Sequence, residues 1–166
     1  MSAQALVQRF MRPRTLNLAV FLASAGLIGF GIYLQEVEQL EPCPLCILQR
    51  YAYVVVGLLA LLAALLPRFL GRMVGSLGIL SALTGAGIGV WHVWLQLHPP
   101  VVSDCGPRFE YLISKLPLTR ALPRIFHGYG DCTQIDWTFL GLSIPAWSVI
   151  CMICLAALQI LAQRRA

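Results

Sequence analysis

Four long apolar segments constrain this chain more than any other feature of its sequence. They cover residues 16–34, 46–66, 73–97 and 138–162. An α-helix needs about 20 mostly apolar residues to cross the hydrocarbon core of a bilayer. The second segment contains a single charge, Arg50, and the fourth has Pro145 near its start. The sequence therefore predicts an all-α membrane protein, a bundle of four transmembrane helices.

Composition excludes the other broad classes of protein. Hydrophobic residues make up 58% of the 166 residues and charged residues only 11%, whereas roughly a quarter of a soluble domain is charged. A soluble globule of this size has too much surface to hide that apolar content, and a disordered chain would be far more polar. We expect one integral membrane domain over residues 1–166. The net charge of +5 includes no basic run longer than Arg164-Arg165, so nucleic-acid binding is not expected.

The distribution of charge predicts the orientation of the bundle. Arginines occur in the N-terminal tail, in the turn at 67–72 and in the C-terminal tail, whereas 35–42 has three Glu and no basic residue. The positive-inside rule then places both termini in the cytoplasm and the loops 35–45 and 98–137 outside. The first segment is longer than a signal-peptide core and lacks a small-x-small site after it, so we interpret it as an uncleaved helix.

Two further patterns concern packing. In the second outer loop, Phe109, Leu112, Ile113 and Leu116 have helical spacing. A short helix on the membrane surface and a helix packed on the outer end of the bundle both fit this pattern. In the third segment, Gly78-x3-Ala82 and Gly85-x3-Gly89 predict close approach of a neighbouring helix.

The six cysteines fall into three pairs. Cys43 and Cys46 lie at the outer mouth of the second helix, Cys105 and Cys132 in the second outer loop, and Cys151 and Cys154 deep in the fourth helix. Outward-facing cysteines often form structural disulfides. A C-x-x-C loop, however, is too short to constrain an unfolded chain much. Because Pro44 suits a first helical position, this pair opens a helix, where free N–H groups stabilise a thiolate.

Arg50 lies on the same helical stripe as this pair. Cys43, Cys46 and Arg50 are spaced i, i+3, i+7, which places Arg50 roughly 9 Å below the start of the helix. A charge inside a span indicates a function, and the alternative is an arginine extended towards the lipid headgroups.

The remaining candidates are less specific. No metal site is expected, because zinc would need a second close cysteine pair or a close histidine pair. His92 and Gln96 near the outer end of the third helix also fit interhelical hydrogen bonding. Cys151 and Cys154 have no charged neighbour and are interpreted as apolar core.

Two outward thiol pairs, one beside an intramembrane arginine, indicate electron transfer. A partner would reduce the loop pair, and thiol–disulfide exchange would pass the electrons to the helix-mouth pair. The acceptor must reach Cys46 and Arg50 from the bilayer. A quinone fits, because Arg50 would stabilise negative charge on its carbonyl oxygen.

Sequence motifs along nearly the whole chain resemble the DsbB family of bacterial quinone-dependent thiol oxidases. They are Pro42-Cys43-Pro44-Leu45-Cys46 with Arg50, Leu95-Gln96-Leu97, Gly130-Asp131-Cys132, Trp137-Thr138-Phe139-Leu140-Gly141-Leu142 and Pro145-Ala146-Trp147. The resemblance implies a protein of the bacterial inner membrane that reoxidises a periplasmic DsbA-type dithiol oxidase, with ubiquinone or menaquinone as cofactor.

The resemblance also implies roles for individual residues. Cys105 would form the mixed disulfide with the partner and Cys132 would be its loop mate. Cys46 would contact the quinone with Cys43 as its redox mate, and Arg50 would bind the quinone. The positions near that site are His92, Gln96 and Trp137.

Two alternatives remain. The vitamin K epoxide reductase family also combines four helices, thiols and quinones, but its C-x-x-C lies late in the chain. A non-catalytic membrane scaffold with two structural disulfides is the other. For the contact with a partner, the prolines and β-branched residues of 99–105 predict an extended segment that would lie in a peptide groove.

Overall fold

The computed structural model describes residues 12–40, 42–99, 130–135 and 137–165, with the single residues 117, 119 and 126. Its long helices are α2 (Pro13–Val37), α3 (Pro44–Leu65), α4 (Arg68–Leu97) and α8 (Ile144–Arg164). The short elements are α7 (Gly130–Thr133), β1 (Thr138–Phe139) and β2 (Leu142–Ser143). All four long helices are long and apolar enough to cross a membrane. The expected four-helix membrane fold is therefore confirmed.

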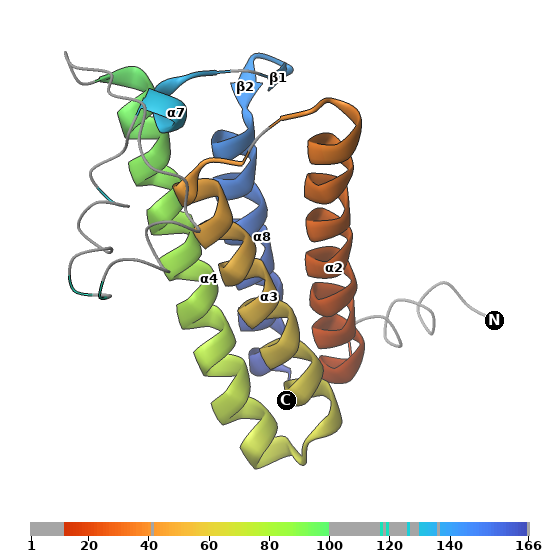
Figure 1. The fold of residues 1–166 in the computed structure, drawn as a ribbon. Helices are drawn as coiled ribbons and strands as arrows, with labels where there is room; N and C mark the ends of the chain where they lie inside the picture. The colour runs from red at the N-terminus through yellow and green to blue at the C-terminus, as the bar shows by residue number, and fades with distance from the viewer. Residues whose placement is uncertain are drawn as a thin grey trace.

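The long helices form a closed up-and-down bundle (Figure 1). Helix α3 packs against α2 and α4, and α8 packs against α4 and α2. The start of α2, the α3–α4 turn and the end of α8 lie at one end of the bundle. The α2–α3 connection, α7 and the β1–β2 hairpin lie at the other, which we call the outer end.

Proline marks the start of three of these helices. Pro13 and Pro44 are the first residues of α2 and α3, and Pro145 is the second residue of α8. A helix leaves its first N–H groups unpaired, so a residue that lacks an N–H and has a fixed φ costs nothing there.

The fourth helix begins later than its hydropathy indicates. We expected it from residue 138, whereas residues 138–143 form a hairpin in which Thr138 pairs with Ser143 and Phe139 with Leu142. Leu140 and Gly141 turn the chain with φ of 52° and 79°, as a tight two-residue hairpin loop requires. The hairpin is as apolar as a helix, and a short apolar run does not distinguish the two.

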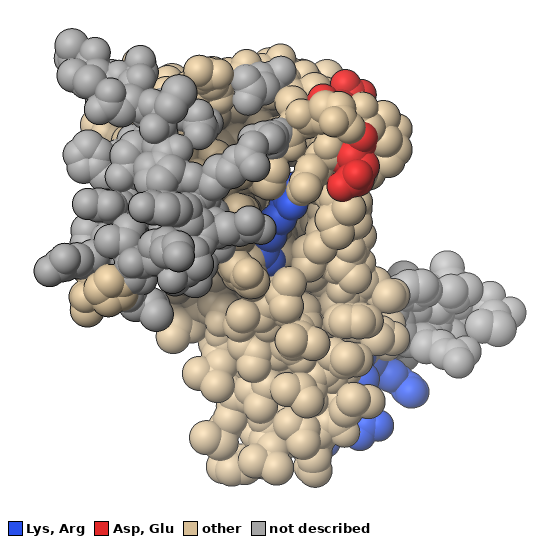
Figure 2. Space-filling view, viewed as in Figure 1, with Lys and Arg blue, Asp and Glu red and all other residues tan. Residues whose placement is uncertain are grey.

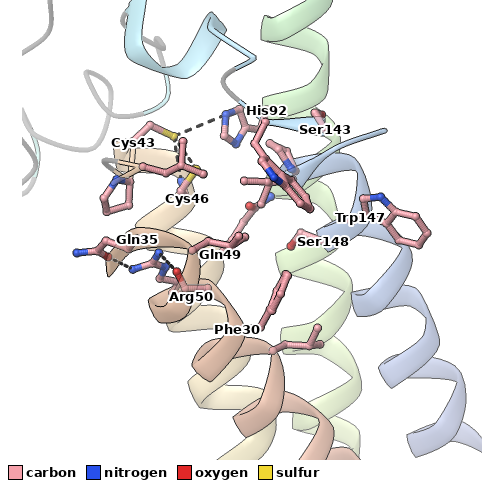
Figure 3. Close-up of a pocket in the computed structure, with 18 of the residues that line it drawn as sticks. Phe30, Gln35, Cys43, Cys46, Gln49, Arg50, His92, Ser143, Trp147 and Ser148 are labelled. Carbon is pink, nitrogen blue, oxygen red and sulfur yellow. Dashed lines mark hydrogen bonds between the residues drawn. The ribbon is translucent and has the colours of Figure 1, made fainter. Parts of the chain in front are cut away.

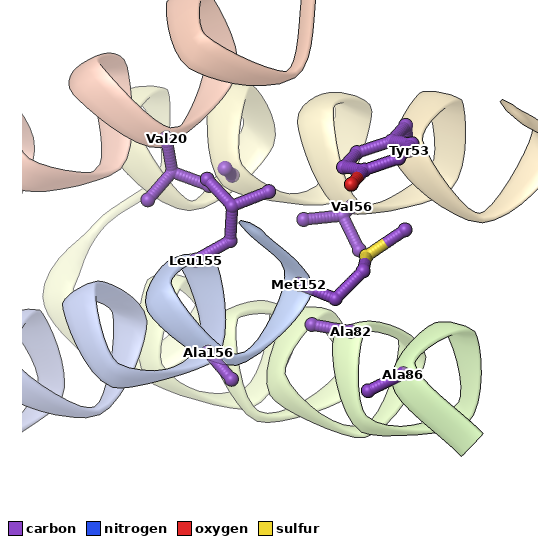
Figure 4. Close-up of a cluster of buried hydrophobic side chains, with 9 residues drawn as sticks. Val20, Tyr53, Val56, Ala82, Ala86, Met152, Leu155 and Ala156 are labelled. Carbon is purple, nitrogen blue, oxygen red and sulfur yellow. The ribbon is translucent and has the colours of Figure 1, made fainter. Parts of the chain in front are cut away.

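The core of the bundle contains side chains from all four helices (Figure 4). It includes Val20 of α2, Val56 of α3, Ala82 of α4 and Met152 of α8, each with no exposed surface. At Gly78 of α4, a Cβ atom would lie 2.5 Å from the side chain of Gln159. The predicted close approach at the small residues of α4 is confirmed: α8 approaches at Gly78, and both α3 and α8 approach at Gly85 and Gly89.

Apart from Arg50, most charged side chains of the described residues lie towards one or the other end of the bundle. Figure 2 shows acidic side chains near the outer end of α2 and basic side chains near the opposite end. This is the asymmetry on which the expected orientation rests. The expected helix at 109–116 and the extended segment at 100–105 lie outside the described residues.

Candidate active site

A cavity of about 580 Å³ lies in the outer half of the bundle (Figure 3). All four long helices and the segment 134–143 contribute to its wall. Most of the lining side chains are aliphatic or aromatic, including Leu27, Ile28, Phe30, Leu34, Ile135 and Ile144. Several polar groups and three cysteine sulfur atoms interrupt this lining. Volume and composition match those of binding sites for small, largely apolar molecules.

Cys43 and Cys46 lie at the start of α3 and both line the cavity. Cys43 is the N-cap of this helix, and its Sγ accepts a hydrogen bond of 3.3 Å from the Cys46 N–H. The Cys43 thiol in turn donates to Cys46 Sγ over 2.9 Å. The predicted position of the pair at a helix start is confirmed. A thiol–thiol hydrogen bond of this length brings the two sulfurs within easy reach of disulfide formation.

Cys132 joins this pair from the other outer segment. It is the third residue of α7, is 1% exposed and packs in one cluster with Cys43 and Leu95. Hydrogen bonding to the Cys132 thiol, hydrogen bonding to Cys46 and burial together raise the pKa of the Cys43 thiol well above its ordinary value. Residues from the two outer segments, far apart in sequence, are therefore in contact.

His92 of α4 faces the same sulfurs. Its side chain is 2% exposed, and its Nε2 lies 3.6 Å from Cys43 Sγ. Among the described residues, its Nδ1 has no hydrogen-bond partner. The structure thus places His92 beside Cys43 rather than beside Arg50.

Arg50 lines the cavity one helical turn below Cys46. Its guanidinium donates to Gln35 Oε1 over 2.7 Å and to the Gly31 carbonyl over 3.0 Å, both on α2. Because Gly31 has no side chain, α2 approaches the guanidinium closely: a Cβ atom there would lie 3.6 Å from Arg50 Nε. The arginine is therefore held inside the bundle by α2, in contrast to the alternative in which it extends to headgroups.

Comparison with known proteins decides the family of this chain. The family model for disulfide bond formation protein DsbB matches residues 13–162. The chain belongs to the DsbB family. It is 52% identical to disulfide bond formation protein B of Azoarcus sp. (strain BH72) over 139 residues, which is 82% of this chain and 84% of that protein. It is 47% identical to disulfide bond formation protein B of Aromatoleum aromaticum over 156 residues, 92% and 94% of the two chains.

Membership of the DsbB family makes this chain a multi-pass membrane oxidoreductase of disulfide bond formation. Within that frame, Gln96 and Trp137 line the cavity at its outer end. Gln96 Oε1 accepts a hydrogen bond of 2.7 Å from Ser143 Oγ, so this side chain joins α4 to the hairpin. Trp137 stacks on Phe139 with ring centroids 6.0 Å apart. These two residues form part of the outer wall of the cavity.

Sequence reasoning missed two polar residues that α3 contributes to the cavity wall. Gln49 is 4% exposed, and its Nε2 has no hydrogen-bond partner among the described residues. Tyr53 donates from its hydroxyl to the Ser148 carbonyl over 3.1 Å. Gln49 and Tyr53 lie three and seven residues after Cys46, so a helical wheel drawn from Cys46 would have identified both.

The remaining cysteines are Cys105, Cys151 and Cys154. Cys105 lies outside the described residues, so its expected role stays a prediction. Cys154 is exposed on the outside of the bundle, whereas Cys151 is half-buried and contributes to the inner wall of the cavity. The expectation that both are core residues is therefore wrong for Cys154, because α8 presents successive turns to lipid as well as to the bundle.

Proposed function

We propose that this protein is a thiol:quinone oxidoreductase that reoxidises a DsbA-type dithiol oxidase. The observation that carries the proposal is that Cys46 and Arg50 line the same apolar cavity. An electron acceptor that dissolves in the bilayer would meet there both a redox-active sulfur and a positive charge. Membership of the DsbB family of disulfide bond formation proteins supports the proposal.

The residues of the cavity suit a quinone, that is ubiquinone or menaquinone. When bound, a quinone supplies a flat apolar ring that accepts two electrons and two protons. Only two of the five N–H groups of a guanidinium are accounted for by the Arg50 contacts with α2. Gln49 Nε2, buried and unpartnered among the described residues, is a further donor to a carbonyl oxygen. Aromatic and aliphatic side chains enclose the rest of the ring and exclude water.

Contact between Cys132 and Cys43 supports a relay between the two thiol pairs. In this relay the partner's thiolate attacks Cys105 of a Cys105–Cys132 disulfide, and Cys132 leaves as a thiolate. Cys132 then attacks Cys43 of a Cys43–Cys46 disulfide, which releases Cys46 as the thiolate facing the cavity. Each exchange breaks one S–S bond and forms one, so the electron pair reaches Cys46 without any other oxidant.

Orientation completes the proposal. We place this single domain in the bacterial inner membrane, with both termini and the α3–α4 turn in the cytoplasm. The outer end, with its thiols, then faces the periplasm, where a DsbA-type partner is present. The arginine-rich inner end and the acidic end of α2 support this orientation.

Quinone reduction by the purified protein tests the proposal. The protein in lipid nanodiscs is mixed anaerobically with a reduced DsbA-type protein and a short-chain ubiquinone or menaquinone. We expect the quinone absorbance to decrease only when the dithiol donor is present. The rate of this decrease should be proportional to the concentration of the enzyme. A membrane scaffold with structural disulfides would instead show no donor-dependent reduction, and that result would overturn the proposal.

The partner contact has a separate test. Cys132→Ser removes the thiol that would resolve the mixed disulfide, so the partner should stay linked to Cys105. Non-reducing electrophoresis and mass spectrometry of the linked peptide identify the bond. If the partner is found on Cys132 in Cys105→Ser and never on Cys105, the two roles are reversed.

A further inference from the structure

Three side chains of the cavity wall place metal-binding atoms close to one another. Cys43 Sγ, Cys46 Sγ and His92 Nε2 all lie within 4.8 Å of one another (Figure 3). The donors come from the start of α3 and from α4, whose outer ends are packed together. Because His92 lies on another helix, no spacing in the sequence pointed to this set, and the sequence predicted no metal site.

We propose that the reduced protein binds a thiophilic divalent metal ion, foremost Zn²⁺, through Cys43 Sγ, Cys46 Sγ and His92 Nε2. Zinc takes sulfur and imidazole ligands in tetrahedral geometry, with Zn–S near 2.3 Å and Zn–N near 2.0 Å. Two such ligands around one ion lie about 3.5 to 3.8 Å apart. The separation of 3.6 Å between Cys43 Sγ and His92 Nε2 already meets this requirement. The two sulfurs, now 2.9 Å apart, need to separate by less than about 1 Å.

The surroundings of His92 point to a ligand as well. This histidine is 2% exposed, and its Nε2 is directed at the sulfurs. Imidazole coordinates a metal through a ring nitrogen, and Nε2 is the ring nitrogen that lies 3.6 Å from Cys43 Sγ. Cys132 packs in one cluster with Cys43, so a further sulfur lies next to the proposed site.

Metal binding and thiol oxidation exclude each other at this site. Binding converts two thiols to thiolates and releases two protons, with no transfer of electrons. A Cys43–Cys46 disulfide has no thiolate left, so only the reduced pair binds the ion. Conversely, thiolates held by zinc are removed from disulfide exchange. If the proposed function holds, zinc arriving from the periplasm therefore inhibits the enzyme in its reduced state.

Cobalt binding tests the site directly. The full-length protein in detergent is reduced, freed of reductant and titrated anaerobically with Co²⁺, whose thiolate charge-transfer and tetrahedral absorption bands report its ligands. We expect one Co²⁺ per chain, displaced by Zn²⁺, and no such bands after oxidation of the thiols. Equal binding by the oxidised protein would overturn the proposal.

Two variants separate this site from other thiols. His92→Ala should weaken Co²⁺ binding by about tenfold or more, since even the loss of a residue that only supports a ligand costs that much. Cys154→Ser, which removes a cysteine on the outside of the bundle, should bind as the parent protein does. Unchanged binding by His92→Ala, with its helical content intact, would contradict the assignment.

The metal site and the proposed function can be refuted independently of each other. Quinone reduction is measured in the presence of a chelator, so it needs no ion at the site. Protein that reduces quinone but binds no Co²⁺ would overturn the metal site alone. Protein that binds Co²⁺ through these donors but reduces no quinone would support the metal site and overturn the proposed function.

Discussion

Two C-x-x-C pairs occur in this chain, and their surroundings differ. Cys43 and Cys46 lie at the beginning of α3, whereas Cys151 and Cys154 lie within α8. The spacing is identical, so spacing alone does not distinguish a redox pair from two unrelated cysteines. The surroundings of each pair must therefore account for any difference in reactivity.

The first difference is the backbone. At the start of α3, the Cys46 N–H has no carbonyl one turn before it and donates to Cys43 Sγ. In the interior of α8, the N–H groups are used by the helix itself. Only the α3 pair therefore receives a backbone donor that stabilises negative charge on sulfur.

The second difference is the set of neighbouring side chains. The α3 pair has His92, Cys132 and, one turn below, Arg50 around it. The α8 pair has the Tyr53 hydroxyl on one side of Cys151, and Cys154 is exposed on the outside of the bundle. A positive charge and the neighbouring thiol of Cys132 are what the α3 pair has and the α8 pair lacks, whereas Cys151 shares the cavity wall with the α3 pair.

The largest expected effect comes from the α3 pair itself. Cys46→Ser should reduce donor-dependent quinone reduction to the uncatalysed rate, because a hydroxyl neither forms a disulfide nor exchanges with one. Cys154→Ser is the matched control and should turn over as the parent protein does. The measurement is quinone absorbance with a reduced DsbA-type donor. Appreciable turnover by Cys46→Ser would show that the acceptor takes its electrons elsewhere.

The second-largest effect is expected from substitution of Arg50. Arg50→Ala should lower kcat/KM for quinone by about a hundredfold, the usual cost of losing one preorganised donor to a developing negative charge. Arg50→Lys should recover only part of this loss, since it restores charge but not the planar fork. Membrane insertion should not suffer, because a charge has left the span. Parental kinetics in Arg50→Ala would refute the role.

Gln35 tests whether α2 must hold the guanidinium in place. Gln35→Leu removes the acceptor of the 2.7 Å bond from Arg50, so the arginine loses its fixed orientation. We expect KM for quinone to rise by about tenfold, with a smaller change in kcat. Gln163→Leu is the control, because Gln163 donates to Arg72 and Ser76 at the inner end of the bundle. Equal effects of both variants would mean that only general packing has changed.

The fold was predictable from the sequence because lipid imposes a simple rule. Each span must be a long apolar helix, so the four long apolar segments predicted the four helices. The hairpin at 138–143 was missed because its Phe139, Leu140 and Leu142 are as apolar as a helix turn. Side-chain hydropathy carries no information about Leu140 and Gly141 at positive φ.

The site was predictable only where its residues are close in sequence. Cys43, Cys46 and Arg50 share one helical stripe, so their common position on the cavity wall follows from helix geometry. The contacts of Arg50 with α2 and of Cys43 with His92 and Cys132 depend on how helices rotate and pack against each other. Helical spacing within one segment does not determine that rotation.

The smallest expected effect completes the comparison. The double variant Cys151→Ala, Cys154→Ala should keep quinone turnover within about twofold of the parent protein, since neither sulfur belongs to the proposed relay. Cys154 is exposed and Cys151 only half-buried, so the loss of two thiols should cost about 1 kcal/mol or less of stability. Turnover and thermal unfolding are measured on the same preparation. Cys151 does contribute to the cavity wall, so any small change should appear in KM for quinone, and Cys154→Ala alone should show none. A collapse of kcat in the double variant with unchanged unfolding would mean that the α8 pair carries electrons, and that the surroundings of the α3 pair are not what makes a C-x-x-C redox-active.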